Sequence, residues 1–233
     1  MKISLSDLRK IIKEELIQEA AFSPSDAINR GMALYSYADE AGMFETFVLY
    51  KAYGQEVEEQ ESKLQPGVRM NVVTRDSIYS GVTSDQYDIT SVVMSAIVGV
   101  IRVAKKSKDQ MAYVDGVITK QKGYGPLLYD IALRYHGPIM QSPISVSKDA
   151  KRIWKGYQTK RKKDVDYTGG SSPQIALKAR TSVNVIKLRE VHENLPDNIR
   201  NLKGPSFNVN SFRESLEKTL YREGQELIKT LHM

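Results

Sequence analysis

Hydrophobic and polar residues repeat with different periods along this chain, and the periods predict where its helices lie. Residues 1–22 carry leucine and isoleucine at intervals of three and four, with charged residues between them, which predicts an amphipathic helix. Residues 20–26 predict a linker that ends in a helix cap at Ser25, and a helix from Asp26 to about Ala41 follows. Later helices are predicted at 127–135, at 148–159 and from the capping box Ser211-x-x-Glu214 onward.

Runs of β-branched and aromatic residues predict the strands. These runs lie at 46–53, 68–74, 95–104, 111–119 and 139–146. The segment 105–109, which contains three lysines, has the composition of a hairpin turn between two of them. Residues 164–204 have the composition of loops, and no helix or strand is assigned to them.

This order of elements predicts a mixed α/β (α+β) fold, in which helices flank a mainly antiparallel sheet. We expect three segments: a leader helix at 1–19, a domain at 20–163, and an extension at 164–233 whose C-terminal helix packs on the domain. The longest apolar stretch, 92–101, is about half of the ~20 residues that cross a membrane. A buried strand is therefore expected there, and no membrane partner.

Cysteine and histidine usage restricts the chemistry. The chain has no cysteine, which excludes disulfides, thiolate zinc sites and a cysteine nucleophile. Its three histidines, His136, His192 and His232, have no ligand spacing between them. We therefore expect neither a metal site nor a histidine-based catalytic triad.

The positive charge is concentrated in one segment. The chain has a net charge of +6, yet residues 120–163 alone carry eleven basic residues against two acidic ones. Residues 1–66 are acidic instead, with a net charge of −5. A phosphate-bearing partner for the basic segment and an ordinary solvated helix with a lysine-rich loop both remain open.

The turn after the strand at 111–119 is the best candidate for binding an anion. Gly123 and Gly125 would let the backbone approach a ligand closely at the start of the next helix. Unpaired amides and the helix dipole favour a phosphate at such a position. Lys120 and Lys122 add positive charge to it.

The hexapeptide Lys120-Gln121-Lys122-Gly123-Tyr124-Gly125 resembles the Q/R-x-x-G-x-G/A loop of the GNAT acetyltransferases, which holds the pyrophosphate of acetyl-CoA. The following strand and helix, residues 145–154, resemble the segment that lines the thiol end of the cofactor. The likeness covers 96–157. It implies acetyl-CoA as cofactor, a small-molecule or protein amine as acceptor, and these cofactor-binding residues: Lys120, Lys122, Gly123, Tyr124, Gly125 and Leu127.

The chain departs from the family pattern at three positions. Lys120 stands where glutamine or arginine is usual, and Pro126 removes one amide that could bind phosphate. Trp154 stands where the family often has the tyrosine that protonates the leaving thiolate, and an indole cannot supply that proton.

Two residues are candidates for catalysis by the resemblance. Asp115, on the strand before the loop, would take the proton of the attacking amine, and Tyr157 could replace the missing acid. The alternatives are a solvent-facing Asp115, with Tyr113 and Val117 on its face, and a Tyr157 packed on a helix face. Gly116 could mark a bulge that splays two strands to admit the pantetheine arm, or be incidental.

The first segment resembles a different kind of signal. Ile17-Gln18-Glu19 followed by Ala20 is similar to the sites cut by the prohead proteases of T-even-like tailed phages. The resemblance implies cleavage between Glu19 and Ala20, capsid or prohead components as partners, and a location in the virion interior or the host cytoplasm. A helix that docks on the domain or on another chain is the alternative.

Three functions follow from these patterns. The first is a phage-encoded GNAT-like N-acyltransferase that moves an acetyl group from acetyl-CoA to an amine. The second is a catalytically inactive internal or structural virion protein that retains the fold. The third, nucleic-acid binding through 148–163, is not expected, because Trp154 and Tyr157 are the only aromatic residues within that segment.

Overall fold

A computed structural model describes residues 23–52, 97–105, 111–141, 146–167, 175–178, 183–203 and 208–231. The strands are β1 Met32–Ala38, β2 Phe44–Lys51, β3 Ile97–Ala104, β4 Ala112–Thr119, β5 Ile139–Met140, β6 Val165–Tyr167 and β7 Ile175–Leu177. The helices are α2 Pro24–Asn29, α6 Gly125–His136, α7 Lys148–Lys160, the 3-10 turn η1 Lys162–Asp164, α8 Val183–Lys203 and α9 Val209–Lys229. The expected leader helix and the expected strand at 68–74 lie outside the described residues.

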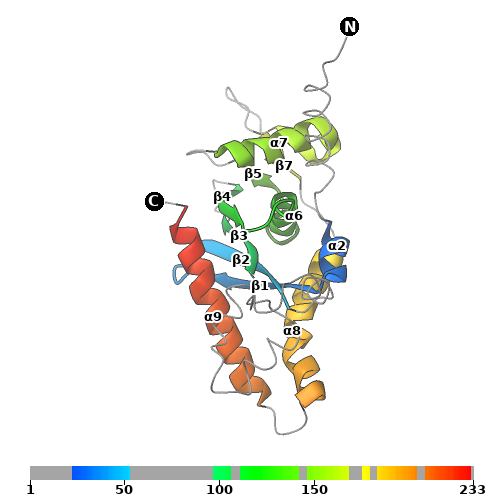
Figure 1. Ribbon diagram of the computed structural model, residues 1–233. Coiled ribbons are helices and arrows are strands. Elements are labelled where there is room, and N and C mark those ends of the chain that lie inside the picture. Colours follow the sequence, from blue (N-terminus) through cyan, green and yellow to red (C-terminus); the bar gives the residue numbers. More distant parts are fainter. Residues whose placement is uncertain are drawn as a thin grey trace, which may run out of the picture.

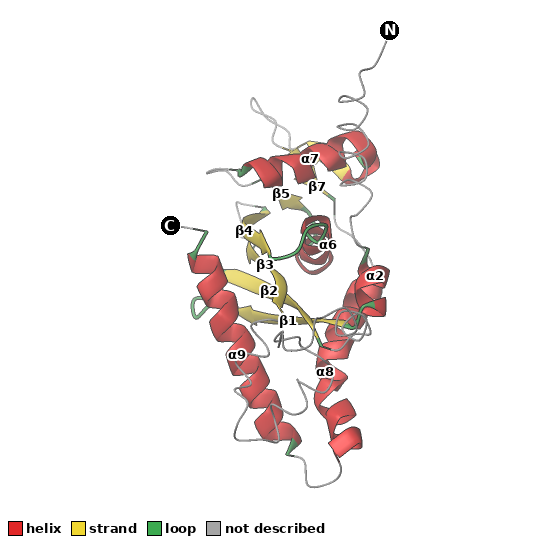
Figure 2. Cartoon of the chain, viewed as in Figure 1, coloured by secondary structure: helices red, strands yellow, loops and turns green. Residues whose placement is uncertain are grey.

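The seven strands form one sheet in the order β1-β2-β3-β4-β5-β7-β6. Figure 1 labels β1 to β5 and β7. All neighbouring strands are antiparallel except β4 and β5, which run parallel and pair at Ala112 with Ile139 and at Tyr113 with Met140. Helices flank the sheet, as Figure 2 shows. The predicted α+β fold with a mainly antiparallel sheet is therefore confirmed. The strands β6 and β7, which follow residue 163, belong to the same sheet.

Two hydrophobic clusters hold the helices to opposite faces of the sheet, with α6 on one face and α9 on the other (Figure 1). The larger cluster joins α2, α6, α7 and the start of α8 to the strands. The other joins α9 to the strands and includes Leu195 of α8. The helix α8 packs against the edge strand β1 and contributes to both clusters, with Val185 and Leu188 in the first.

The prediction of a helix from Asp26 to Ala41 was wrong. The helix α2 ends at Asn29, and Met32–Ala38 forms the edge strand β1, paired along its whole length with β2. Pairing with β2 satisfies the backbone of β1, and no local pattern encodes that partner. The cap also differs, because Ser23 and Asp26 form a reciprocal capping box, with Asp26 N–H donating to Ser23 Oγ over 3.2 Å.

Two predictions on the C-terminal side were also wrong. Within 164–204, where no element was predicted, lie β6, β7 and the 21-residue helix α8. Pro196 lies inside α8 and interrupts the helical signal. The last helix begins at Val209, and its cap is Asn208, whose Oδ1 accepts from Ser211 N–H over 3.0 Å. The predictions for β3, β4, α6 and α7 are confirmed to within two residues at each end.

Candidate functional site

The loop between β4 and α6 is short and is fixed at both ends. The Lys120 amide at its start donates to the Val98 carbonyl of β3 over 2.8 Å, and the Leu128 amide donates to the Tyr124 carbonyl over 3.1 Å. Gly123 has a φ of 91°, in the left-handed region that glycine adopts without strain. The sequence-predicted binding residues therefore lie together where β4 passes into α6.

The N-terminus of α6 has no side-chain cap. Its N-cap residue, Tyr124, makes no capping hydrogen bond with its side chain. The first amides of a helix have no partner within the helix, so those of Gly125 and Leu127 are directed out of its end. Pro126 stands between them and contributes no N–H.

Side chains of the loop divide between the core and the surface. Tyr124 and Leu127 are buried in the core cluster shared by α6 and α7, whereas Lys120 and Lys122 are exposed. Gly125 lies close to α7, because a Cβ built on it would stand 2.9 Å from Ile153 Cδ1. The loop therefore presents backbone and lysines to solvent, and its aromatic side chain serves packing.

Asp115 lies at a bulge in β4. Its neighbours Gly116 and Val114 pair with the consecutive residues Arg102 and Val103 of β3, so Asp115 is the additional residue. The Arg102 guanidinium donates from Nε to Asp115 Oδ2 over 2.6 Å. Both side chains are mostly buried: the exposed fraction is 23% for Arg102 and 14% for Asp115.

The bulge changes the face assignment that simple alternation predicts. Val117 packs against the α6-side cluster, whereas Asp115 lies on the other face with Arg102, whose guanidinium stands 4.9 Å from the centre of the Phe44 ring. The expected grouping of Val117 with Asp115 on one face was therefore wrong. The extra residue at a bulge shifts every later side chain on the strand to the opposite face.

The last turn of α9 closes over this bulge. A Cβ built on Gly116 would overlap Leu231 Cδ1, and Ile228 Cδ1 would lie 4.0 Å from it. Glycine at this position therefore leaves room for the Leu231 side chain, just after the end of α9, against β4. The surface beside Asp115 is thus bounded by the end of α9.

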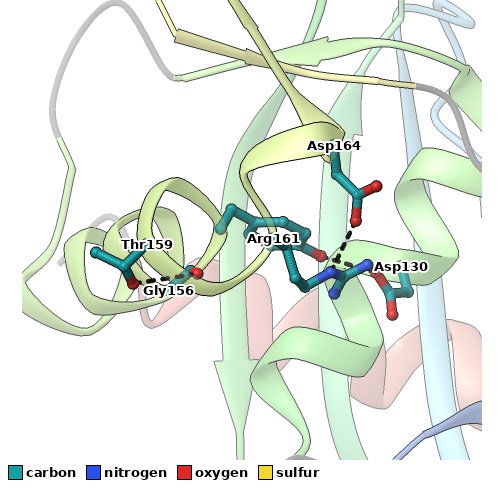
Figure 3. Close-up of polar contacts among 6 residues, drawn as sticks. Asp130, Gly156, Thr159, Arg161 and Asp164 are labelled. Carbon is teal, nitrogen blue, oxygen red and sulfur yellow. Dashed lines mark hydrogen bonds and ion pairs between the residues drawn. The ribbon is translucent and has the colours of Figure 1, made fainter.

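A polar network joins α6, α7 and η1, and Figure 3 labels Asp130, Arg161 and Asp164 of it. Tyr157, which is buried, belongs to the same network. Its hydroxyl donates to Asp130 Oδ1 over 2.8 Å. Arg161 donates to the same oxygen over 3.1 Å from Nη2, and to Asp164 Oδ2 over 2.9 Å from Nε. The Arg161 guanidinium also lies 4.3 Å from the centre of the Tyr157 ring. One arginine therefore joins two carboxylates and an aromatic ring.

Burial governs the proton affinities in this network. Burial raises the pKa of Asp130, and the charge of Arg161 and the Tyr157 hydroxyl oppose that rise. Burial, followed by the negative charge of Asp130, holds the pKa of Tyr157 well above its usual value. Tyr157 is therefore protonated at neutral pH, and its proton points to Asp130.

Trp154 is also part of the core. It is 3% exposed and meets Tyr129 of α6 edge-on, with 6.1 Å between the ring centres. A hydrogen bond from Trp154 opposes the effect of burial on Tyr129, whose pKa is raised to about 12. Trp154 therefore stabilises the packing of α7 against α6.

The structure brings some candidate residues together and separates others. The loop residues from Lys120 to Leu127 are adjacent, whereas Asp115 is on the α9 side of the sheet and Tyr157 belongs to the α6 side. Glu19 and Ala20 lie outside the described residues. No group of three potential metal ligands occurs among the described residues, and no described helix is long and apolar enough to cross a membrane.

Sequence reasoning missed three charged residues that organise these regions: Arg102, Asp130 and Arg161. Arg102 interrupts the apolar strand β3, and Asp130 interrupts the apolar run of α6. A single charged residue within an otherwise buried run requires a partner. Arg102 and Asp130 could therefore have been recognised from the sequence as residues with a charged partner. Arg161 could not, because it lies among surface lysines.

No family model, curated protein or solved structure matches this chain.

Proposed function

We propose that this chain is a GNAT-like N-acyltransferase that binds acetyl-CoA at the β4–α6 loop and transfers the acetyl group to an amine. The observation that carries the proposal is the start of α6 at Gly125, which has no side-chain cap and lies two residues after Gly123, whose φ is 91°. Helix amides without a side-chain cap suit the pyrophosphate of the cofactor, and the exposed Lys120 and Lys122 add charge complementarity.

The strand arrangement supports the same proposal. The parallel strands β4 and β5 pair at two positions, at the start of β4, and Gln141 after β5 donates to the Ile175 carbonyl of β7. The printed pairs of this parallel ladder are Ala112 with Ile139 and Tyr113 with Met140, so the ladder lies before the bulge of β4. Together with the bulge at Asp115, this arrangement fits the splayed strands that the resemblance implies for a pantetheine arm.

The proposed chemistry assigns different roles to the two catalytic candidates. As the amine nitrogen bonds to the acetyl carbon and the C–S bond breaks, Asp115 would accept the amine proton, with Arg102 holding the carboxylate in place. The Tyr157 hydroxyl already donates a hydrogen bond to Asp130. We therefore assign it a positioning role between α6 and α7, and the leaving thiolate would take its proton from solvent.

Calorimetry with acetyl-CoA tests the binding half of this proposal. The wild-type chain should bind with micromolar affinity, and Lys120→Glu combined with Lys122→Glu should weaken binding about tenfold or more by reversing two charges beside the phosphates. Lys187→Glu with Lys218→Glu is the matched control, because both lysines are exposed on α8 and α9. If no binding is measured at millimolar acetyl-CoA, the proposal is wrong.

The alternative is a catalytically inactive virion protein that keeps the fold. Two observations favour it: Leu231 packs over Gly116, where the resemblance implies room for the pantetheine arm, and the Tyr157 hydroxyl is hydrogen-bonded to Asp130 and so is not available as a general acid. Mass spectrometry of mature phage particles tests it. The chain should be found there beginning at Ala20, without acetyl-CoA binding; an intact Met1 in particles, or absence from them, would contradict the packaging hypothesis.

A further inference from the structure

The segment formed by α7 and η1 contains the whole excess of positive charge. Residues 148–164 hold eight basic residues and two acidic residues, a net charge of +6, which equals the net charge of the entire chain. Seven of the eight are exposed, and we name them the basic surface: Lys148, Lys151, Arg152, Lys155, Lys160, Lys162 and Lys163. The charges of the rest of the chain sum to zero, so the net positive charge of the protein is that of this segment.

Helical spacing places four of these cations in one row. Lys148, Lys151, Arg152 and Lys155 recur at intervals of three and four, and the buried Ala150, Trp154 and Tyr157 lie on the opposite side of α7. The row extends about 11 Å along the helix, from a rise of ~1.5 Å per residue. The same length of a nucleic-acid duplex carries about six phosphate charges.

Few carboxylates neutralise the basic surface. Within the described part of the chain, Asp149 pairs with Arg152 over 3.2 Å, and the six lysines of the surface form no ion pair. Asp164, at the end of η1, forms an ion pair with Arg161. After it, the first exposed carboxylate along the chain is that of Asp166.

The helix α9 of the same chain shows how an ordinary solvated face differs. It carries four basic and four acidic residues, and Lys229 pairs with Glu226 one turn earlier. Mixed charge of this kind is typical of helices that only face water, because opposite charges one turn apart stabilise each other. On α7 the basic residues have one acidic partner, Asp149, which pairs with Arg152. The positive charge of α7 therefore does not serve to stabilise the helix.

The surroundings of α7 select the class of partner. Its apolar side is buried in the core, and the exposed large hydrophobic residues of the described chain lie elsewhere, so α7 has nothing to insert into a membrane. Tyr167, on β6 directly after η1, is 60% exposed. An exposed aromatic ring beside lysines is suited to stack on an unpaired base.

From these observations we infer that the basic surface binds nucleic acid through its phosphates, with Tyr167 stacking on bases where the nucleic acid is single-stranded. From the sequence this partner was not expected, because Trp154 and Tyr157 are the only aromatic residues within 148–163. In the structure both of them are buried. The exposed aromatic ring lies a few residues beyond that segment. The inference is independent of acetyl-CoA binding, since Lys120 and Lys122 are not part of the basic surface.

Fluorescence anisotropy with a labelled single strand and a duplex of equal length tests the inference. At low salt the wild-type chain should bind both, and log affinity should fall linearly with log salt. Lys148→Glu, Arg152→Glu and Lys155→Glu together should weaken binding at least thirtyfold and flatten the salt slope by about three. The control of equal charge, Lys187→Glu with Lys218→Glu and Lys229→Glu, should leave the slope unchanged, and thermal melts should show that both variants fold.

Two further measurements separate the partners. Tyr167→Ala should weaken single-strand binding about fivefold or more and leave duplex binding unchanged. Vesicles of phosphatidylserine should bind no better than vesicles of neutral lipid at physiological salt. The inference is overturned if the wild-type chain binds neither nucleic acid at low salt, if the triple variant matches its control, or if only the anionic vesicles bind.

Discussion

The Tyr157 hydroxyl on α7 donates a hydrogen bond of 2.8 Å to the Asp130 carboxylate on α6. Arg161 donates to the same oxygen, so one buried carboxylate receives two donors from the α7 segment. A buried charge is stable only when it is paired and hydrogen-bonded, and here both conditions are met. The contact therefore sets how α7 lies on α6, and so how the basic surface is presented.

Tyr157→Phe should lower the free energy of unfolding by about 1–2 kcal/mol, because Asp130 loses one of its donors while buried. Urea denaturation measures this change. Tyr221→Phe is the matched control, since its ring is 40% exposed, and it should change stability by less than about 0.5 kcal/mol. Acyl transfer should persist in Tyr157→Phe; a folded variant with turnover reduced a hundredfold would contradict the positioning role.

Asp115→Asn should separate binding from catalysis. Acetyl-CoA affinity should be retained, whereas turnover should fall about a hundredfold or more, because an amide cannot accept the amine proton. Stability should fall as well, by about 1–2 kcal/mol, since the half-buried Arg102 loses its carboxylate. Single-turnover kinetics beside calorimetry would measure both, and unchanged turnover would remove Asp115 from the proposed chemistry.

His192 should make folding sensitive to acid. Its Nδ1 lies 2.8 Å from the Tyr50 hydroxyl, and its Nε2 lies 3.7 Å from Glu217 Oε1. Burial first, then the charges of Arg213 and Arg189, lowers its pKa to about 4 from 6.5. Between these values the unfolded chain binds more protons, so the contribution to stability is complete above pH 6.5 and is lost as the pH falls toward 4.

The size of this effect follows from the shift. Between pH 7 and pH 4.5 the wild-type chain should lose about 2 kcal/mol through His192 alone. His192→Gln keeps a polar partner for Tyr50 but does not titrate, so the stability difference between the two proteins should narrow by that amount at pH 4.5. Equal pH dependence of the two denaturation curves would show that His192 does not contribute.

Gly116→Ala tests the packing of α9 against β4. The added methyl group overlaps Leu231 Cδ1, so the Leu231 side chain must shift, at a cost of about 1 kcal/mol. The obstructing atom is the end of a flexible side chain, and Leu231→Ala should therefore remove most of that cost in the double variant. A double-mutant cycle by thermal denaturation measures the coupling, and strict additivity would mean that the two residues do not touch in solution.

Local patterns located the elements that carry both proposed sites. The alternating and β-branched residues of β3 and β4 and the apolar spacing of α6 and α7 lie within single segments, so they can be recognised without any partner. The loop from Lys120 to Leu127 was recognised for the same reason. By contrast, β1 was mistaken for a helix, because its pairing with β2 outweighs local preference. The helix α8 was not recognised, because Pro196 interrupts its helical signal.

The sequence by itself determined the α+β class, the position of the Gly123 loop before a helix, and the concentration of positive charge in 148–163. Only the tertiary structure decided which side chains remain available. It buries Trp154 and Tyr157, pairs Asp115 with Arg102, and leaves Tyr167 exposed. The physical reason is that burial and pairing depend on neighbours that chain folding brings from distant segments, whereas charge and glycine content are properties of the residues themselves.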